Sequence, residues 1–272
     1  MAIIKTDNLT KYYGNQLGIK DLSFEVAAGS IFGFLGANGA GKTTTIRLLL
    51  GLLHSSNGFF EIMGNKISKK TKYPEEQAKK IGFLPGNLSL YQDMTGRDFL
   101  DYMGKLYDKL NYDLQQTTVK TLELSEKQLS RKISGYSRGM KQKLGIIQAI
   151  QHDPELIIMD EPTEGLDPLM KRNFYDIVNK LQQRGKTIFF SSHNLNEVEK
   201  ICFKVAIIRQ GRLITIESID ELKSKRLYNI EFTLADKEQA KDLDLDLEGI
   251  QKINTDNNMI NIRWKGDFSD LF

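Results

Sequence analysis

The fold of this chain is restricted most by one short stretch, Gly36-Ala37-Asn38-Gly39-Ala40-Gly41-Lys42-Thr43. It fits the spacing G-x-x-x-x-G-K-[ST], and the apolar run of residues 31–35 leads directly into it. Apolar side chains follow at the spacing of one helix face, at Ile46, Leu49, Leu50 and Leu53. A glycine-rich loop between a strand and a helix turns backbone N–H groups inward, where they surround phosphate oxygens. The stretch therefore predicts an α/β fold that binds a nucleoside triphosphate, with a chance glycine-rich turn as the alternative.

Two side chains of this loop have distinct expected roles. Lys42 is a point charge for the β- and γ-phosphates, and Thr43 offers a hydroxyl to Mg²⁺. The other residues that we expect to contact the nucleotide along the loop are Gly36, Asn38, Gly39, Ala40, Gly41 and Thr44.

The composition is that of a soluble globular protein, with 27% charged and 40% hydrophobic residues among 272. The net charge of +3 suits a phosphate-bearing ligand or an anionic membrane surface, but it is too small to argue for nucleic acid. The single cysteine, Cys202, excludes an internal disulfide and fits a reducing compartment. The first residues lack the pattern of a signal peptide, and no apolar run is long enough to span a bilayer. We expect a chain that is cytosolic by itself.

The order of the expected elements indicates a mainly parallel sheet covered by helices on both faces. Residues 1–30 alternate in the way of strands, and we expect them to form an antiparallel N-terminal subdomain. Residues 156–159 and 187–190 are compact apolar strands separated by a helical stretch. A mostly helical insertion occupies about 87–152, and a hairpin at 205–216 closes this body.

We expect one large domain, residues 1–223, followed by a small α+β appendage, residues 224–272. In the appendage, short strands at 229–233 and 259–264 flank an acidic stretch whose composition resembles that of a linker. The chain ends at Phe272 without an obvious terminator, so we treat the appendage as one that can be incomplete.

A second group of candidate residues follows the apolar strand of residues 156–159. Asp160 comes at the carboxyl end of this strand, beside the phosphate loop, where its carboxylate would hold Mg²⁺ directly or through water. Glu161, the next residue, can polarise a water molecule for in-line attack on the γ-phosphate. A solvated acidic strand end is the alternative, which the nearby phosphate loop disfavours.

Together with the loop and the acid pair, the stretch Tyr136-Ser137-Arg138-Gly139-Met140 resembles the ATP-binding subunit of an ABC transporter. In that family a signature, most often L-S-G-G-Q, precedes the acid pair by a fixed interval. Counting back 24 residues from Asp160 reaches Tyr136. The resemblance makes Ser137 the signature serine and Gly139 its second glycine, and it leaves Ser134-Gly135 as a turn. It also implies a P-loop NTPase (RecA-like) fold, with ATP as the nucleotide.

Local sequence supports the same choice of serine. Ser137 directly precedes a helical run with Leu144, Ile147 and Ile150 on one side, so it occupies the N-cap position. In the family this helix start is aimed at the γ-phosphate bound by the opposite subunit. Arg138 departs from the usual glycine of the signature. It either adds positive charge near the nucleotide or points to solvent, and we favour solvent because the sequence shows no partner.

The resemblance assigns roles to three further residues. Asp167 lies where the family has its D-loop and would reach across a dimer. His193 follows the strand at 187–192, where it would hydrogen-bond the γ-phosphate and orient the attacking water, as a third catalytic group beside Lys42 and Glu161. Tyr13 would stack on the adenine, with its neighbour Tyr12 as the alternative.

A few residues depart from the family pattern or lie outside it. The position of the glutamine that helps to ligate Mg²⁺ in the family holds Gly86 here, followed by Asn87. Either Asn87 or water substitutes for it, or hydrolysis is slow until a partner docks. His54 and His152 have no functional context and are expected at the surface, and Cys202 is expected to be a small buried hydrophobe.

The function that the resemblance implies is that of an ATPase subunit driving a membrane transporter, with bacterial drug, peptide or lipid exporters as the closest type. Two copies, or one copy and a close relative, would hold ATP between the phosphate loop and the signature. Transmembrane permease subunits would receive the closure through the loop after Pro85 and residues 91–100, on the cytoplasmic side of the cell membrane. Two alternatives stay open: a soluble ATPase of this type that acts on nucleic acid or the ribosome, and an ATP-gated binding module with little turnover.

Overall fold

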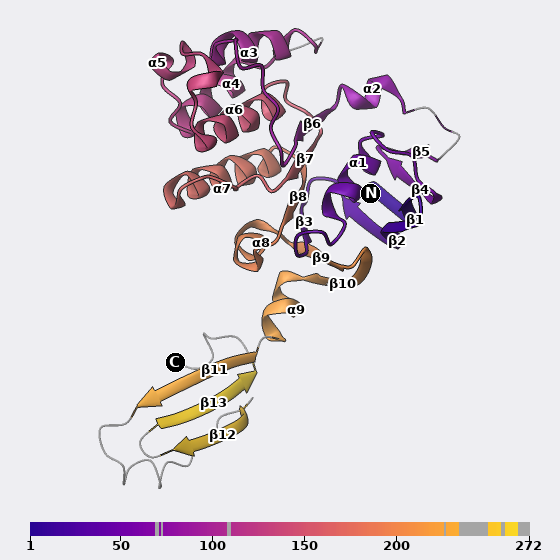
Figure 1. Ribbon diagram of the computed structural model, residues 1–272, viewed down its shortest axis with the longest axis vertical. Helices are drawn as coiled ribbons and strands as arrows, with labels where there is room; N and C mark the ends of the chain where they lie inside the picture. Colours follow the sequence, from indigo (N-terminus) through magenta and orange to yellow (C-terminus); the bar gives the residue numbers. More distant parts are fainter. Residues whose placement is uncertain are drawn as a thin grey trace. The chain divides into compact units, whose positions relative to one another are not determined.

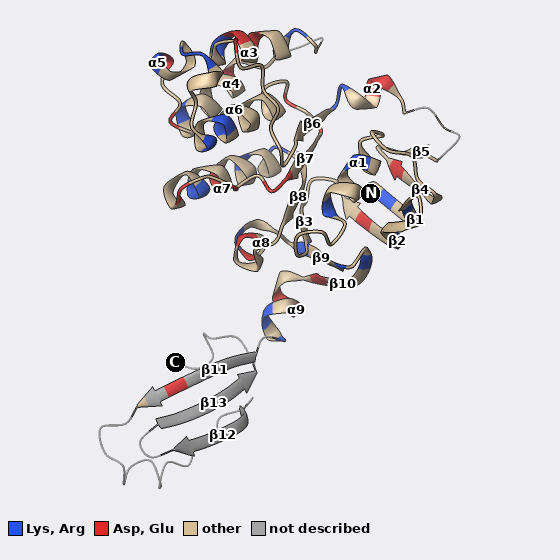
Figure 2. Ribbon diagram, viewed as in Figure 1, with Lys and Arg blue, Asp and Glu red and all other residues tan. Residues whose placement is uncertain are grey.

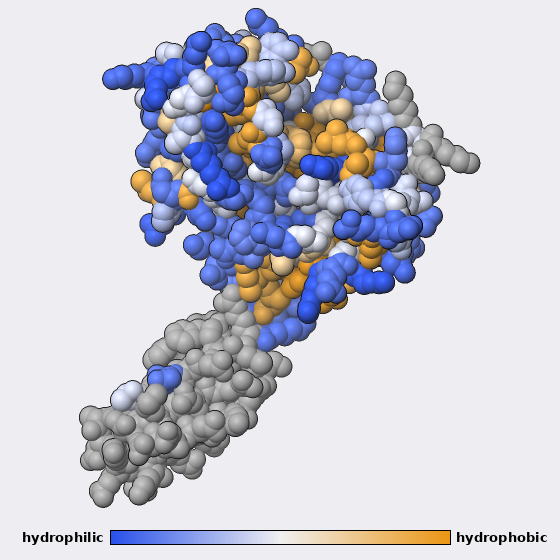
Figure 3. All heavy atoms as spheres, viewed as in Figure 1, coloured by the Kyte–Doolittle hydropathy of each residue, from blue (hydrophilic) through white to orange (hydrophobic). Residues whose placement is uncertain are grey.

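The computed structural model describes residues 1–68, 71, 73–107, 110–225, 227–233, 250–256 and 259–265. These residues form two compact units, Met1–Ile216 and Glu217–Phe272 (Figure 1). Within the described part of the chain, every helix is too short or too polar to cross a membrane. The visible face of Met1–Ile216 is mostly hydrophilic, with separate apolar areas rather than one continuous apolar surface (Figure 3).

The first unit is built on a largely parallel sheet. Each parallel pair joins strands that are distant in the sequence, as β3 does with β8 and β7 does with β8. Every residue of β3, β7 and β8 is buried, as expected for apolar strands covered on both faces. The strands in spatial order are β10 (Arg212–Ser218), β9 (Lys204–Arg209), β3 (Ile31–Leu35), β8 (Thr187–Ser192), β7 (Leu156–Asp160) and β6 (Ile81–Leu84).

Helices lie on both sides of this sheet. Helix α1 (Lys42–Leu49) lies on one side, and α7 (Pro168–Gln183) and α8 (Leu195–Ile201) lie on the other (Figure 1). Helix α7 is amphipathic and buries Phe174, Ile177 and Val178 among other side chains. The α/β class expected from alternating strands and helices is therefore confirmed.

The N-terminal strands form a separate antiparallel sheet in the order β2 (Gln16–Ala27), β1 (Ala2–Tyr13), β4 (Asn57–Ile62) and β5 (Asn65–Ile67). Phe24 of β2 stacks on Phe32 of β3 at a ring distance of 5.9 Å, and Phe32 stacks on Phe189 of β8 at the same distance. These apolar contacts join the two sheets in one core, which holds the phosphate loop at the end of β3.

A helical region lies between β6 and β7. It contains α3 (Gly96–Gly104), α4 (Tyr112–Thr121), α5 (Glu126–Leu129), the 3₁₀ turn Ile133–Gly135 and α6 (Arg138–Ile150). The short helix α2 (Glu75–Ala78) lies before β6. Thr95 caps α3, because its hydroxyl accepts a hydrogen bond from the Asp98 N–H at 3.1 Å. The expected turn at Ser134-Gly135 is confirmed, and Arg131 donates to the Gly135 carbonyl there.

His152 is not the surface residue that we expected. It follows α6 and its ring stacks on Tyr107, with ring centroids 3.6 Å apart and planes inclined by 9°. One ring nitrogen lies 3.3 Å from the carbonyl oxygen of Ile81. No local pattern indicates this contact, because Tyr107 and His152 are brought together only by the packing of segments that are distant in the sequence. His54 is exposed, as expected.

The second unit contains α9 (Ile219–Ser224) and an antiparallel sheet in the order β11 (Leu227–Thr233), β13 (Met259–Lys265) and β12 (Ile250–Asp256). Ser218 and Glu221 form a capping box at the start of α9. The two strands expected in this part are present, and β12 was not anticipated. Most of the acidic stretch that we interpreted as a linker lies outside the described residues.

Candidate functional site

The phosphate loop connects β3 to α1 with two glycines in the left-handed region. Gly39 has φ 78° and Gly41 has φ 110°. A β-carbon on Gly41 would lie 2.7 Å from Cγ2 of Ile19, so both its conformation and its surroundings require glycine. The loop therefore keeps its backbone N–H groups free of side chains at the start of α1, where the helix dipole favours an anion.

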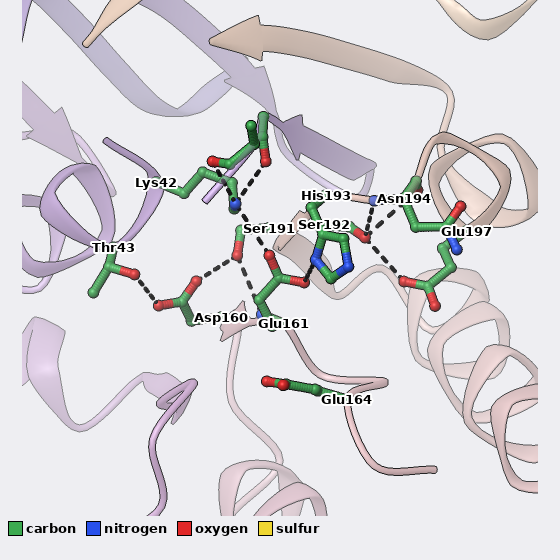
Figure 4. A network of polar contacts seen from close by, with 12 residues as sticks. Lys42, Thr43, Asp160, Glu161, Glu164, Ser191, Ser192, His193, Asn194 and Glu197 are labelled. Atoms are coloured by element: carbon green, nitrogen blue, oxygen red, sulfur yellow. Dashed lines mark hydrogen bonds and ion pairs between the residues drawn. The ribbon is translucent and has the colours of Figure 1, made fainter. Parts of the chain in front are cut away.

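Lys42 is 6% exposed and points along the loop toward the acid pair. Its Nζ donates to the carbonyl oxygens of Gly36 at 2.6 Å and Ala37 at 3.2 Å. It also lies 3.1 Å from Oε1 of Glu161 (Figure 4). A buried ammonium that bonds these carbonyl and carboxylate oxygens can exchange them for the phosphate oxygens of a nucleotide.

Asp160 ends β7 and is 4% exposed. The Thr43 hydroxyl donates to Oδ2 of Asp160 at 2.6 Å, which places the two expected metal ligands side by side. The other carboxylate oxygen, Oδ1, accepts a hydrogen bond from the hydroxyl of Ser191 at the end of β8 (Figure 4). Hydroxyl and carboxylate oxygens are the protein ligands that Mg²⁺ prefers, so this pair fits the ion.

Glu161 is held in an unusual backbone conformation, with φ 51°. Such a left-handed residue is strained unless its neighbours fix it, and strain of this kind gathers at functional sites. Its N–H donates to the hydroxyl of Ser191 at 3.1 Å. Its Oε2 lies 2.9 Å from Nδ1 of His193. Lys42 therefore contacts one oxygen of the carboxylate and His193 contacts the other. This arrangement suits a carboxylate that accepts a proton from an attacking water.

Ser191 is one residue of the site that sequence reasoning missed. It is fully buried and bonds both members of the acid pair, Asp160 through the carboxylate and Glu161 through the backbone. The available signal was its position at the carboxyl end of a buried strand, two residues before His193.

A second carboxylate supports the loop that carries His193. Glu197 is 7% exposed and accepts hydrogen bonds from Ser192 at 2.9 Å and from Lys171 at 2.7 Å (Figure 4). Burial alone would raise the pKa of Glu197, but the hydrogen bonds from Lys171, Thr163 and Ser192 hold it below its ordinary value. Glu197 therefore stays ionised and ties α8 to α7.

Most of the expected nucleotide residues meet in one cavity of about 520 Å³. Its volume suits a ligand of the size of a nucleotide. Tyr13 lies at its edge, 44% exposed, with its hydroxyl 3.4 Å from that of Thr44. Tyr12 does not line the cavity. The expected residues that do line it are Tyr13, Asn38, Gly39, Gly41, Lys42, Thr43, Thr44, Asp160 and Glu161.

Six expected residues do not line the cavity: Gly36 and Ala40 of the phosphate loop, His193, and Ser137, Gly139 and Asp167. Ser137 is the exposed N-cap of α6, and its hydroxyl accepts from the Met140 N–H at 3.2 Å. Asp167 is the N-cap of α7 and accepts from the Met170 N–H at 2.9 Å. Gly139 follows in the first turn of α6. The cavity of one chain thus holds the phosphate loop and the acid pair but not the signature.

Arg138 is exposed to solvent, as we favoured, but it is not without a partner. Its guanidinium donates to the carboxylate of Glu164, although its side chain is 71% exposed. The partner was not evident because it lies 26 residues further along the chain. Glu164 itself lines the cavity, a contact that sequence reasoning also missed.

Gly86 and Asn87 both line the cavity beside the acid pair. A β-carbon on Gly86 would lie 3.3 Å from Oδ2 of Asp160, a contact tight enough to require one of the two to shift. The glycine therefore lies directly against the expected metal ligand and supplies no side-chain ligand of its own.

Comparison with known proteins adds an independent finding. Residues 19–164 match the family model described as "ABC transporter". The chain is 41% identical to the bacitracin transport ATP-binding protein BcrA of Bacillus licheniformis over 88% of this chain and 77% of that protein. It is 36% identical to the linearmycin resistance ATP-binding protein LnrL of Bacillus subtilis, over 82% and 71%. A solved structure described as the ATP binding subunit of an ABC transporter superposes with a TM-score of 0.73 at 28% identity, covering 81% of this chain and 92% of that one.

Proposed function

The chain belongs to the ABC transporter family as an ATP-binding subunit that hydrolyses ATP, and we propose that two such subunits close on ATP to power a membrane exporter. One observation carries the proposal. Phosphate loop and acid pair share a cavity, whereas Ser137 and Gly139 of the same chain lie outside it. A second subunit is therefore needed to bring a signature to each triphosphate.

The residues of the cavity, together with the neighbouring His193, divide the chemistry among them. Lys42 neutralises charge on the β- and γ-phosphates. Glu161 accepts a proton from a water molecule while the oxygen of that water attacks the γ-phosphorus. The bond between the γ-phosphorus and the oxygen that leaves with ADP then breaks. His193, 2.9 Å from Glu161, fixes the direction of this carboxylate and the position of the water. Tyr13 offers an exposed ring for the adenine.

Mg²⁺ would be held by Thr43 and Asp160, whose oxygens lie 2.6 Å apart, and it would neutralise developing charge on the phosphate oxygens. Among the described residues, no three His, Cys, Asp or Glu side chains gather into a metal site. The ion would therefore depend on the phosphates of the nucleotide for its other ligands.

The exporter assignment rests on the relatives. One is named for bacitracin transport and another for linearmycin resistance, so we propose that this subunit also drives export of a drug, peptide or lipid. We place it on the cytoplasmic side of the membrane, where nucleotide is available. The second ATPase subunit is an identical copy or a close relative.

Exposed aromatic side chains suit a permease contact. Tyr91 is 56% exposed and Tyr102 43%, and their rings meet edge to face at 5.8 Å. They follow the loop after Pro85, which lines the nucleotide cavity. We propose that a segment of a transmembrane permease docks on this surface, since large exposed aromatic groups are typical of interfaces.

The test is a phosphate-release assay on the purified protein with ATP and Mg²⁺. Lys42→Ala removes the buried charge from the phosphates and is expected to lower turnover by about 10²-fold or more. Lys5→Ala is the control, because Lys5 forms an exposed ion pair with Glu25 outside the cavity. Wild-type turnover at background, or full turnover by Lys42→Ala, would contradict the proposal and favour a binding module.

A further inference from the structure

Arg138 joins the signature to the loop that follows the acid pair. It is the first residue of α6, directly after Ser137. Its guanidinium donates to Glu164, which lies three residues beyond Glu161. Lys and Arg residues gather at the start of α6 (Figure 2), and Arg138 is the one whose ion pair reaches toward the nucleotide cavity.

The backbones of the two segments also lie very close. A β-carbon on Gly139 would be 2.9 Å from the carbonyl oxygen of Gly165. A β-carbon on Gly165, which has φ 78°, would be 3.1 Å from Cγ of Arg138. The aliphatic part of Arg138 thus covers Gly165 while its charged end holds Glu164.

Glu164 presents an electrostatic problem for a triphosphate. It is the third carboxylate lining the cavity, with Asp160 and Glu161. Asp160 accepts from Thr43 and Ser191, and Glu161 is paired with Lys42 and His193. The charge of Glu164 is balanced by Arg138. A free carboxylate at this edge would repel the phosphates of a nucleotide.

We propose that Arg138 is a positioning residue for the ATPase reaction, which holds the Glu164 carboxylate away from the triphosphate and fixes the start of α6 against Gly165. The inference rests on the proposed function, since it concerns the same cavity. It also accounts for the arginine that replaces the usual glycine of the signature, because the positive charge of Arg138 compensates the negative charge of Glu164 in the same chain. The side chains of the pair are 71% and 44% exposed, so its effect should weaken as salt screens it.

The experiment is a double-mutant cycle on the full chain, measured as kcat and KM for ATP. Arg138→Gln, which keeps a long side chain over Gly165, is expected to raise KM about fivefold at low ionic strength with kcat within about twofold. Glu164→Gln is expected to lower KM about twofold, because it frees the arginine charge. The double variant should return KM to within about twofold of wild type, because the repulsive carboxylate has been removed.

Salt and a control variant separate the alternatives. The effect of Arg138→Gln should shrink as NaCl is raised from about 0.02 to 0.5 M. Arg184→Gln is the control, since it removes an arginine from an ion pair with Asp153 that does not line the cavity.

Two results would overturn the inference. If the double variant keeps the full KM increase of Arg138→Gln, the arginine acts directly on a nucleotide rather than through Glu164. If Arg138→Gln changes nothing at low salt, the ion pair has no part in the reaction. Failure of the proposed function would be distinct, because wild type and Lys42→Ala would then hydrolyse ATP equally.

Discussion

At the scale of single residues, the acid pair depends on a hydroxyl from a neighbouring strand. Ser191 donates to the carboxylate of Asp160 and accepts from the backbone of Glu161, which is held at φ 51°. One buried hydroxyl thus fixes both the expected metal ligand and the expected base. This explains how a strained residue is kept in one conformation next to the phosphates.

Removal of this hydroxyl should alter the reaction more than the fold. Ser191→Ala leaves Oδ1 of Asp160 and the Glu161 N–H without that partner, so we expect kcat to fall about tenfold and more Mg²⁺ to be needed for half-maximal rate. Ser192→Ala is the matched control, since it also removes a fully buried hydroxyl, but one that donates to Glu197. It should lower the melting temperature similarly without shifting the Mg²⁺ dependence. Equal Mg²⁺ curves for both variants would contradict the role of Ser191.

At the scale of elements, the caps and buried strands followed from local sequence, whereas the contacts between elements did not. Ser137 was expected as a cap from the residues that follow it, and this expectation is confirmed. The pairs Arg138 with Glu164 and Tyr107 with His152 join residues 26 and 45 positions apart. No local sequence pattern indicates such pairs, because they form only when segments distant in the sequence pack together.

His152 makes the packing of the helical region sensitive to pH. Burial, opposed by the Ile81 carbonyl and the Asp153 charge and aided by Lys186, lowers the pKa of His152 to about 4 from 6.5. The unfolded chain therefore binds more protons than the folded chain between these values. The free energy of unfolding should fall as the pH falls through this window, by about 2 kcal/mol between pH 7.5 and 5.

The measurement is urea unfolding at pH 7.5 and at pH 5. The wild-type loss of stability should be reduced in His152→Gln, which carries no titratable ring, and kept in His54→Gln, whose histidine is exposed in the fold. The same loss in His152→Gln as in wild type would assign the pH dependence to other groups.

At the scale of the whole molecule, the resemblance carried by residues 13 to 193 predicted the family and the fold, and both are confirmed. Motif spacing was sufficient for this because the phosphate loop, signature and acid pair each require fixed local geometry. The placement of the signature relative to the cavity could not be derived from one chain's sequence. Nor could the contact of Gly86 with Asp160, because it depends on how β6 and β7 lie side by side.

The central claim is that the binding site of each triphosphate is completed by the signature of a facing subunit. Glu161→Gln should bind ATP without turning it over, so that closed pairs accumulate and light scattering gives twice the mass of one chain. Adding Ser137→Asp keeps an N-cap oxygen for α6 but places a negative charge where the facing γ-phosphate is expected. Adding Ser137→Asn keeps the cap without the charge.

We therefore predict that, with ATP and Mg²⁺, Glu161→Gln and its Ser137→Asn derivative are dimers, whereas its Ser137→Asp derivative is a monomer that still binds nucleotide. A Ser137→Asp derivative that dimerises as fully as the other two would show that this serine faces no triphosphate, and the account of a shared reaction centre would be wrong.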